Sequence, residues 1–205
     1  MREDDFRLAY SVVLSGESCA GTAQGTLLSK MDTEFFWNLI EKTFEASKGN
    51  LSKQVELLTE LLAQNSVDDI IDYKTILNSL MDRAYDASLW DAAIVINCGC
   101  SDDSFLDFRG WLIAHGKEIY EKALVDPEIL VDLVKMDEWA SNELFLYVAE
   151  EAYLLKTWQE LPAHVYRKER PELRGAFWPE ETRNKRFPKL AAKFGDSSNR
   201  WSMLP

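Results

Sequence analysis

Long apolar runs are missing from this sequence of 205 residues. No stretch reaches the roughly eighteen apolar residues of a membrane-spanning helix, so we expect no contact with the interior of a membrane. The N-terminal sequence MREDDFRLAY is acidic, whereas a secretory signal begins with positive charge and continues with an apolar core. Cysteine is scarce, and two of the three, Cys98 and Cys100, are separated by one residue. These features predict a cytoplasmic protein without a disulfide framework.

Common catalytic motifs are also missing. The sequence has no Gly-x-x-x-x-Gly-Lys-Ser/Thr loop, no Gly-x-Gly-x-x-Gly after a strand, no Gly-x-Ser-x-Gly and no His-Glu-x-x-His. Cys98, Cys100 and His115 lack both a fourth ligand and the usual spacing of a zinc site. We therefore assign no catalytic residue, no cofactor and no metal ligand, and we favour a function other than catalysis.

The charge that is present is unevenly distributed. The whole chain has a net charge of −12, but residues 161–205 contain 10 basic and 5 acidic side chains. Residues 1–160 therefore hold 13 basic and 30 acidic side chains, a net charge of −17. Such a body repels phosphate and attracts a basic protein partner. Nucleic-acid binding is expected, if anywhere, only through the basic tail, and nothing specifies an oligomeric state.

The remaining composition predicts a mainly α-helical single domain. Hydrophobic residues make up 46% of the chain, enough for a core, and from Asp32 onward they recur with helical spacing. We expect residues 1–30 to form an extension or edge element, with a possible short strand from Phe6 to Leu14 before a Gly/Ser-rich loop. Residues 31–160 form an acidic helical array, and residues 161–205 form a Pro-rich basic tail that docks on it.

Four cap signals and one proline mark helix starts in the helical region. Asp32 or Thr33 can cap the first helix, and Ser66 with Asp69 resembles a capping box. Ser88 with Asp91 repeats that spacing. Ser101 can cap a later helix, and Pro127 suits a first helical position. These signals predict helices starting near residues 33, 67, 89, 102 and 127.

The segment from Trp90 to Gly116 has the most unusual composition, WDAAIVINCGCSDDSFLDFRGWLIAHG. Adjacent Asp102 and Asp103 suit a metal or acid–base site, but they equally suit the positive end of a helix macrodipole. Arg109 can hold an anionic ligand or bridge acidic side chains of a neighbouring helix. If a binding pocket lies here, its candidate residues are Asn97, Asp102, Asp103, Arg109 and Trp111.

Parts of this pattern resemble a bacterial family catalogued as domain of unknown function 4240. The similarity runs from about Met31 to the final long helix, and the Arg186–Leu190 stretch of the tail is similar to the family's closing motif. The resemblance implies kinship and no particular activity. Its strongest points are Phe36-Trp37-Asn38-Leu39-Ile40, Arg83-Ala84-Tyr85, Trp90-Asp91-Ala92-Ala93, Ser101-Asp102-Asp103, Phe105, Phe108-Arg109, Trp111-Leu112-Ile113-Ala114 and Gly116.

Three functions are compatible with these observations. The first is a non-enzymatic bacterial protein-binding module, of immunity or regulatory type, that engages a basic partner. The second is a small-molecule-binding domain or enzyme with a pocket around Asn97–Trp111. The third uses the basic, aromatic tail as a contact for nucleic acid or an acidic protein; its residues would be Arg183, Lys185, Arg186, Phe187 and Lys189.

Overall fold

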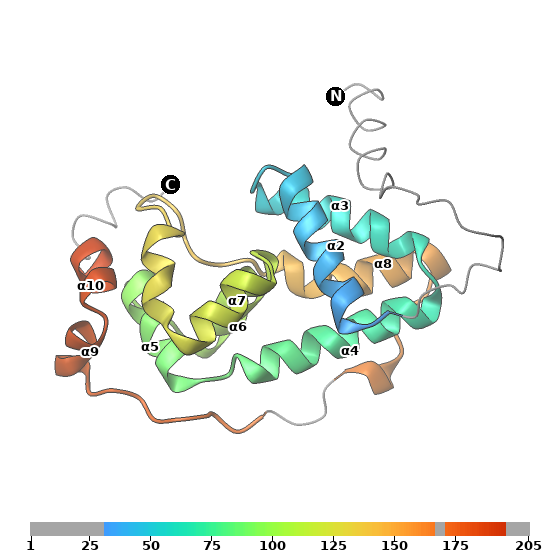
Figure 1. Ribbon diagram of the computed structural model, residues 1–205. Coiled ribbons are helices and arrows are strands. Elements are labelled where there is room, and N and C mark those ends of the chain that lie inside the picture. The colour runs from blue at the N-terminus through green and yellow to red at the C-terminus, as the bar shows by residue number, and fades with distance from the viewer. Residues whose placement is uncertain (1–30, 167–170, 196–205) are drawn as a thin grey trace, which may run out of the picture.

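The computed structural model describes residues 31–166 and 171–195, and these residues form a mainly α-helical protein (Figure 1). The predicted fold class is confirmed, and the described residues contain no β-strand beyond one isolated bridge between Asp86 and Arg174. The possible strand from Phe6 to Leu14 lies outside the described residues. No described helix has a segment that is both long and apolar enough to span a bilayer.

The described elements up to residue 132 follow one another with short connections. In chain order they are α2 (Thr33–Ala46), α3 (Leu51–Gln64), α4 (Val67–Arg83), α5 (Ala87–Ile96), α6 (Asp102–Ala114), α7 (Lys117–Val125), η1 (Pro127–Asp132), η2 (Leu144–Tyr147), α8 (Val148–Thr157), η3 (Ala163–Val165), α9 (Glu180–Arg186) and α10 (Pro188–Phe194). The η elements are 3₁₀ helices, and η1 begins at Pro127 as its sequence predicts.

Side-chain caps explain where several helices begin. Asp32 accepts a hydrogen bond from the Phe35 amide, and Ser66 with Asp69 forms a complete capping box. Ser101 caps α6. The predicted cap at Ser88 is wrong, because Asp86 accepts from the amides of residues 88 and 89 and so starts α5 two residues earlier.

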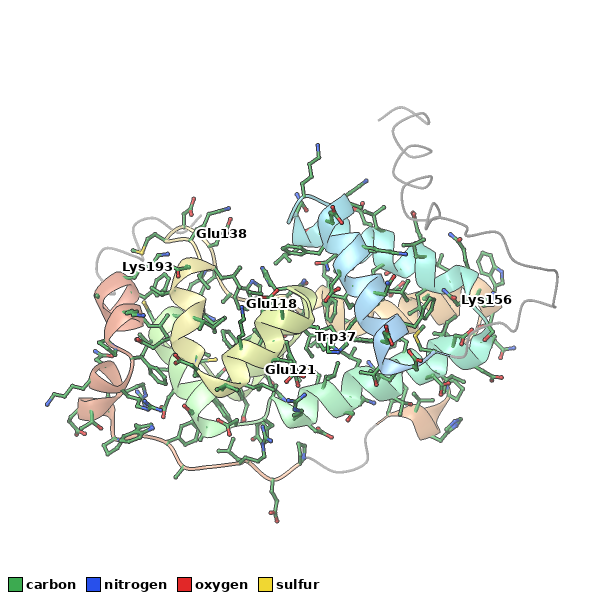
Figure 2. All side chains as sticks on the ribbon, in the orientation of Figure 1. Trp37, Glu118, Glu121, Glu138, Lys156 and Lys193 are labelled. Carbon is green, nitrogen blue, oxygen red and sulfur yellow. The ribbon has the colours of Figure 1, made fainter. Side chains whose placement is uncertain are left out.

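The helices form two neighbouring groups that are joined by the long helix α4. On one side α2, α3 and α8 pack together with α4, and on the other α5, α6, α7 and η1 pack together, with α10 against α5 and η1 (Figure 1). A continuous hydrophobic core runs through both groups. At its centre the Trp37 ring lies 5.4 Å from that of Tyr120, which connects α2 with α7 (Figure 2).

The tail from residue 171 packs against α5 and η1. The Arg174 carbonyl accepts from the Ala87 amide at 2.8 Å, and further along Asp91 on α5 is completely buried. The Asp91 carboxylate accepts from Arg183 Nε at 2.5 Å and from the Trp178 amide at 2.7 Å. Beyond this ion pair the tail buries three apolar side chains, those of Phe187, Leu190 and Phe194.

Candidate functional site

Asn97 ends α5 and is buried, with 4% of its surface exposed. Its side-chain amide donates to the Ala140 carbonyl at 3.1 Å, and its side-chain oxygen accepts from the Ala140 amide at 3.1 Å. These two bonds hold the loop that follows η1 against the end of α5. Asn97 therefore anchors backbone, and it does not line the pocket described below.

Arg109 is also buried and is held between two helices. Its NH1 group donates to the Met81 carbonyl at 2.7 Å, and its Nε donates to the Phe105 carbonyl at 3.3 Å. Met81 lies in the last turn of α4, where carbonyls lack a helical N–H partner. The guanidinium also lies 5.0 Å from each of the Tyr85 and Phe105 ring centroids. It thus caps one helix from another.

Asp102 and Asp103 lie exposed in the first turn of α6. The N-cap residue Ser101 accepts from the Ser104 amide, so the two carboxylates stand at the positive end of a capped helix. The described part of the chain contains no group of three or more His, Cys, Asp or Glu side chains placed to hold a metal ion.

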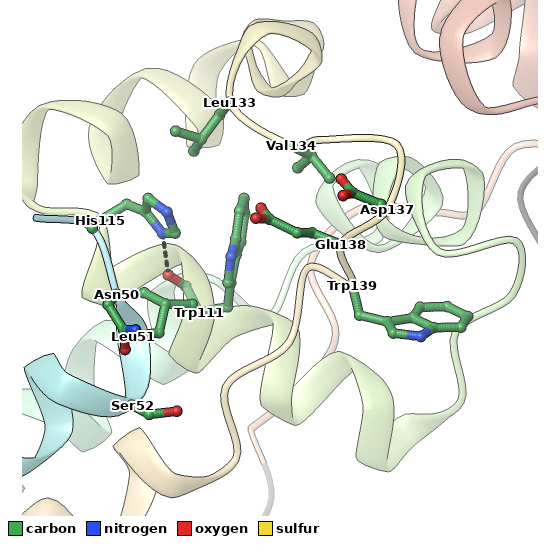
Figure 3. Close-up of a pocket in the computed structure, with 11 residues that line it drawn as sticks. Asn50, Leu51, Ser52, Trp111, His115, Leu133, Val134, Asp137, Glu138 and Trp139 are labelled. Carbon is green, nitrogen blue, oxygen red and sulfur yellow. Dashed lines mark hydrogen bonds between the residues drawn. The ribbon is translucent and has the colours of Figure 1, made fainter. Parts of the chain in front are cut away.

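The structure does not gather the five candidate residues into one site. Trp111 is the one that lines a surface pocket of about 410 Å³ (Figure 3). Three segments form this pocket: the turn between α2 and α3, the end of α6, and the loop after η1. The lining residues are Gly49, Asn50, Leu51, Ser52, Trp111, His115, Leu133, Val134, Asp137, Glu138 and Trp139. We call it the acidic pocket.

Local conformation explains why these three segments meet. Lys48 and Gly49 both adopt positive φ, at 54° and 75°, which turns the chain sharply between α2 and α3. Asn50 then caps α3 by accepting from the Lys53 amide. Gly116, with φ of 92°, ends α6 directly after His115. The third segment is held by the two Asn97 bonds to Ala140, the residue after Trp139.

The lining combines negative charge with aromatic rings. Asp137 and Glu138 contribute two exposed carboxylates, while the lining includes no Lys or Arg. Glu138 accepts from Lys135 Nζ at 2.7 Å, but both side chains are more than half exposed, so this pair is weak in water. Figure 3 shows the Glu138 carboxylate directed towards the indole of Trp111, whereas the ring of Trp139 extends away from Trp111. Carboxylates beside aromatic faces attract a cation.

His115 contributes a polar ring to the same wall. Its Nδ1 lies 2.8 Å from the Trp111 carbonyl oxygen, and since that oxygen can only accept, Nδ1 donates the hydrogen. In the neutral ring, Nε2 is therefore the acceptor. Burial lowers the pKa of His115, an effect that the bond to Trp111 and the charge of Glu138 oppose. The Trp111 and Phe44 rings lie 4.4 and 5.0 Å from the imidazole.

Sequence reasoning did not select Asp137, Glu138 or Trp139. They follow Trp111 by more than twenty residues and lie in a loop without regular structure. The available signal was the Asp-Glu-Trp triplet, in which two adjacent acids precede a large ring in a segment without helical spacing. Composition alone could not show that this triplet faces His115.

The fold and the pocket define an α-helical protein with an acidic, aromatic-lined surface site. Residues 31–154 match the family described as protein of unknown function DUF4240, and the chain belongs to that family. The matched residues include all those that line the acidic pocket and end before the tail. No curated protein and no solved structure matches the chain.

Proposed function

We propose that this protein is a non-enzymatic binding module of the bacterial cytoplasm, of immunity or regulatory type, which engages a basic protein partner. The acidic pocket receives an ammonium or guanidinium group of that partner. The observation that carries the proposal is the pairing of Asp137 and Glu138 with Trp111 and Trp139 in a pocket whose lining has no cationic residue.

Each part of the pocket contributes to holding a cation. The two carboxylates can accept N–H groups, and a guanidinium can engage one of them through two parallel bonds. Trp139 is 38% exposed and offers a cation–π contact, which is worth about 0.5–1 kcal/mol at exposed sites. Trp111 is 4% exposed, and its ring packs against Phe108 and His115 behind the carboxylates. The neutral His115 ring adds an acceptor at Nε2.

The charge of the whole chain supports the same partner. Residues 1–160 have a net charge of −17, and a field of this sign accelerates the approach of a basic surface. The tail carries the opposite charge, but Arg183 is paired with the buried Asp91 and Arg186 lies over the Trp178 and Phe187 rings. These two positive charges of the tail therefore interact within the molecule.

Two sources can supply such a cation, a side chain of a partner protein or a free small molecule. To separate them, the protein is titrated with the amides of N-acetyl-arginine and N-acetyl-lysine, and then with short peptides that carry the same residues. The amide of N-acetyl-norleucine serves as the neutral control. Tighter binding of the peptides supports a protein partner, whereas equal affinity of amides and peptides indicates a small-molecule site.

Matched variants locate the binding. Asp137→Asn and Glu138→Gln remove the pocket's charges, and we expect each to weaken arginine amide binding by about tenfold, or 1.4 kcal/mol. Asp103→Asn removes an equally exposed acid at the start of α6 and should leave the affinity within about twofold. Equal losses in all three variants would show that overall charge, rather than the pocket, attracts the ligand, and the proposal would then fail.

A further inference from the structure

The outward side of η2 and α8 is apolar although it faces water. Five large apolar side chains on it are exposed, and two of them, Leu144 and Trp158, are 60% and 87% exposed. We call this surface the α8 apolar face; its residues are Leu144, Tyr147, Leu154, Leu155 and Trp158. Single exposed apolar residues are ordinary, but several that gather on one surface mark a contact surface.

The row follows the helical period. Leu144, Tyr147 and Leu154 stand at spacings of three and seven, so they share one side of η2 and α8. Trp158 follows at the left-handed residue that ends α8. The opposite side is filled by buried residues that pack against α3 and α4, namely Phe145, Val148, Ala149, Ala152 and Tyr153. A helix that is apolar on both sides is normally covered on both.

Glu151 stands in the middle of this row. It lies four residues after Tyr147 and three before Leu154, so its carboxylate faces water between apolar neighbours. Glu143 and Glu160 are exposed at the two ends of the same segment. The nearby Lys156 donates to the Ala63 carbonyl at 3.2 Å and is directed towards α3. The surface is therefore apolar along its length and negative at its centre and ends.

We propose that the α8 apolar face binds an amphipathic helix of a basic partner, with a Lys or Arg of that helix opposite Glu151. The inference rests on the proposed function for the charge of the partner, but it does not need the acidic pocket to be occupied. The two surfaces are separate, since Glu138 and Lys156 lie at opposite sides of the molecule in Figure 2.

A second copy of this chain fits the surface poorly. Whether two α8 helices packed parallel or antiparallel in register, Glu151 would face Glu151 in the middle of the contact. In the antiparallel arrangement, residues 143 and 160 of the two copies would also approach each other. Like charges in a desolvated contact oppose association, whereas a cationic residue at the same place forms a charge-assisted pair.

The direct test uses two designed helical peptides of about 18 residues, which span roughly 27 Å. Both carry leucine at the same positions, and their polar positions hold Lys in one and Glu in the other. Calorimetry with the full chain should show binding of the Leu/Lys peptide and at least about a hundredfold weaker binding of the Leu/Glu peptide. Glu151→Lys should reverse this preference.

Two further variants distinguish binding at the α8 apolar face from non-specific hydrophobic binding elsewhere on the surface. Leu155→Ser should weaken the Leu/Lys peptide by about tenfold, because it removes an apolar contact from the face. Val125→Ser is the control, since Val125 is 86% exposed but belongs to α7. Equal losses in the two variants, or equal binding of the two peptides, would overturn the proposal.

Two other results would assign the face to a different occupant. If Glu151→Gln turned the protein into a dimer in sedimentation, a second copy would cover the face. If a thiol reagent failed to label Trp158→Cys in the folded monomer, the chain itself would cover it. Failure of the proposed function is distinguishable, because Glu138→Gln should weaken arginine amide binding and leave the tenfold effect of Leu155→Ser on the Leu/Lys peptide unchanged.

Discussion

Two sets of polar residues in this protein differ in what surrounds them. Asn97 and Arg109 are buried, and backbone carbonyls and amides satisfy their side chains. Asp137 and Glu138 lie at the surface of a pocket that also contains two tryptophans. The first set stands out in the sequence, but its side chains hydrogen-bond to the backbone inside the fold. The second set is inconspicuous and faces a space that a ligand can enter.

The difference teaches how to interpret an unusual residue. A polar side chain buried in a core must find hydrogen-bond partners, and helix ends supply carbonyls that need donors. Arg109 meets that need at Met81. Tyr120 adds a second donor to the Leu80 carbonyl at 2.7 Å, which also accepts from the Ala84 amide. A buried polar residue that stands out in the sequence of a helical protein can thus donate to the carbonyls of a helix end rather than bind a ligand.

The largest effect should come from Arg109→Met, which keeps most of the side-chain volume and removes the donors. The Met81 carbonyl would lose its partner inside the core, and we expect unfolding to become easier by about 3 kcal/mol. Urea unfolding measures this change, with arginine amide affinity as the second readout. If Arg109→Met abolished arginine amide binding while the free energy of unfolding stayed unchanged, Arg109 would belong to the binding site and not to the buried structural set.

Asn97→Ala should destabilise the protein by about 2 kcal/mol, because it leaves both backbone groups of Ala140 unpaired. Ala140 follows Trp139 directly, so freeing it loosens one wall of the acidic pocket. We therefore expect amide binding to weaken as well, by about threefold. Binding is measured well below the unfolding midpoint, where the variant is folded. An unchanged affinity would show that the wall is held without Asn97.

The smallest expected effect is on the pH dependence of stability, and it tests whether His115 in the pocket wall is the group responsible. Burial lowers the pKa of His115 below its ordinary value of 6.5, so between the two values the unfolded chain binds the proton more readily. Stability contributed by the neutral ring is thus complete above pH 6.5 and decreases as the pH falls below it. Urea midpoints for His115→Gln should vary less between pH 5.5 and 7.5 than those of the parent chain.

His164→Gln is the matched control, because His164 is the other histidine of the chain and is exposed. It should keep the pH dependence of the parent protein. If instead His164→Gln flattened the dependence and His115→Gln did not, the buried ring beside Trp111 would not be the group that titrates.

Much of the helical framework could be predicted because it depends on local signals. Asp32, the Ser66–Asp69 box, Ser101 and Pro127 each act within a few residues of their own position, and each starts a helix as expected. The cap at Ser88 failed because Asp86 competes for the same amides, and Asp91 belongs to an ion pair with Arg183, ninety-two residues away. Local spacing contains no information on that partner.

The sequence by itself determined the helical class, the kinship and the acidic body, since these follow from periodicity, motif and composition. Tertiary structure decided which side chains face a pocket. Arg109 and Trp111 are neighbours in sequence, but two residues in a helix turn the side chain by about 200°, so one faces α4 and the other the pocket. Asp137 and Glu138 reached that pocket because distant segments packed together, and such packing depends on the whole core.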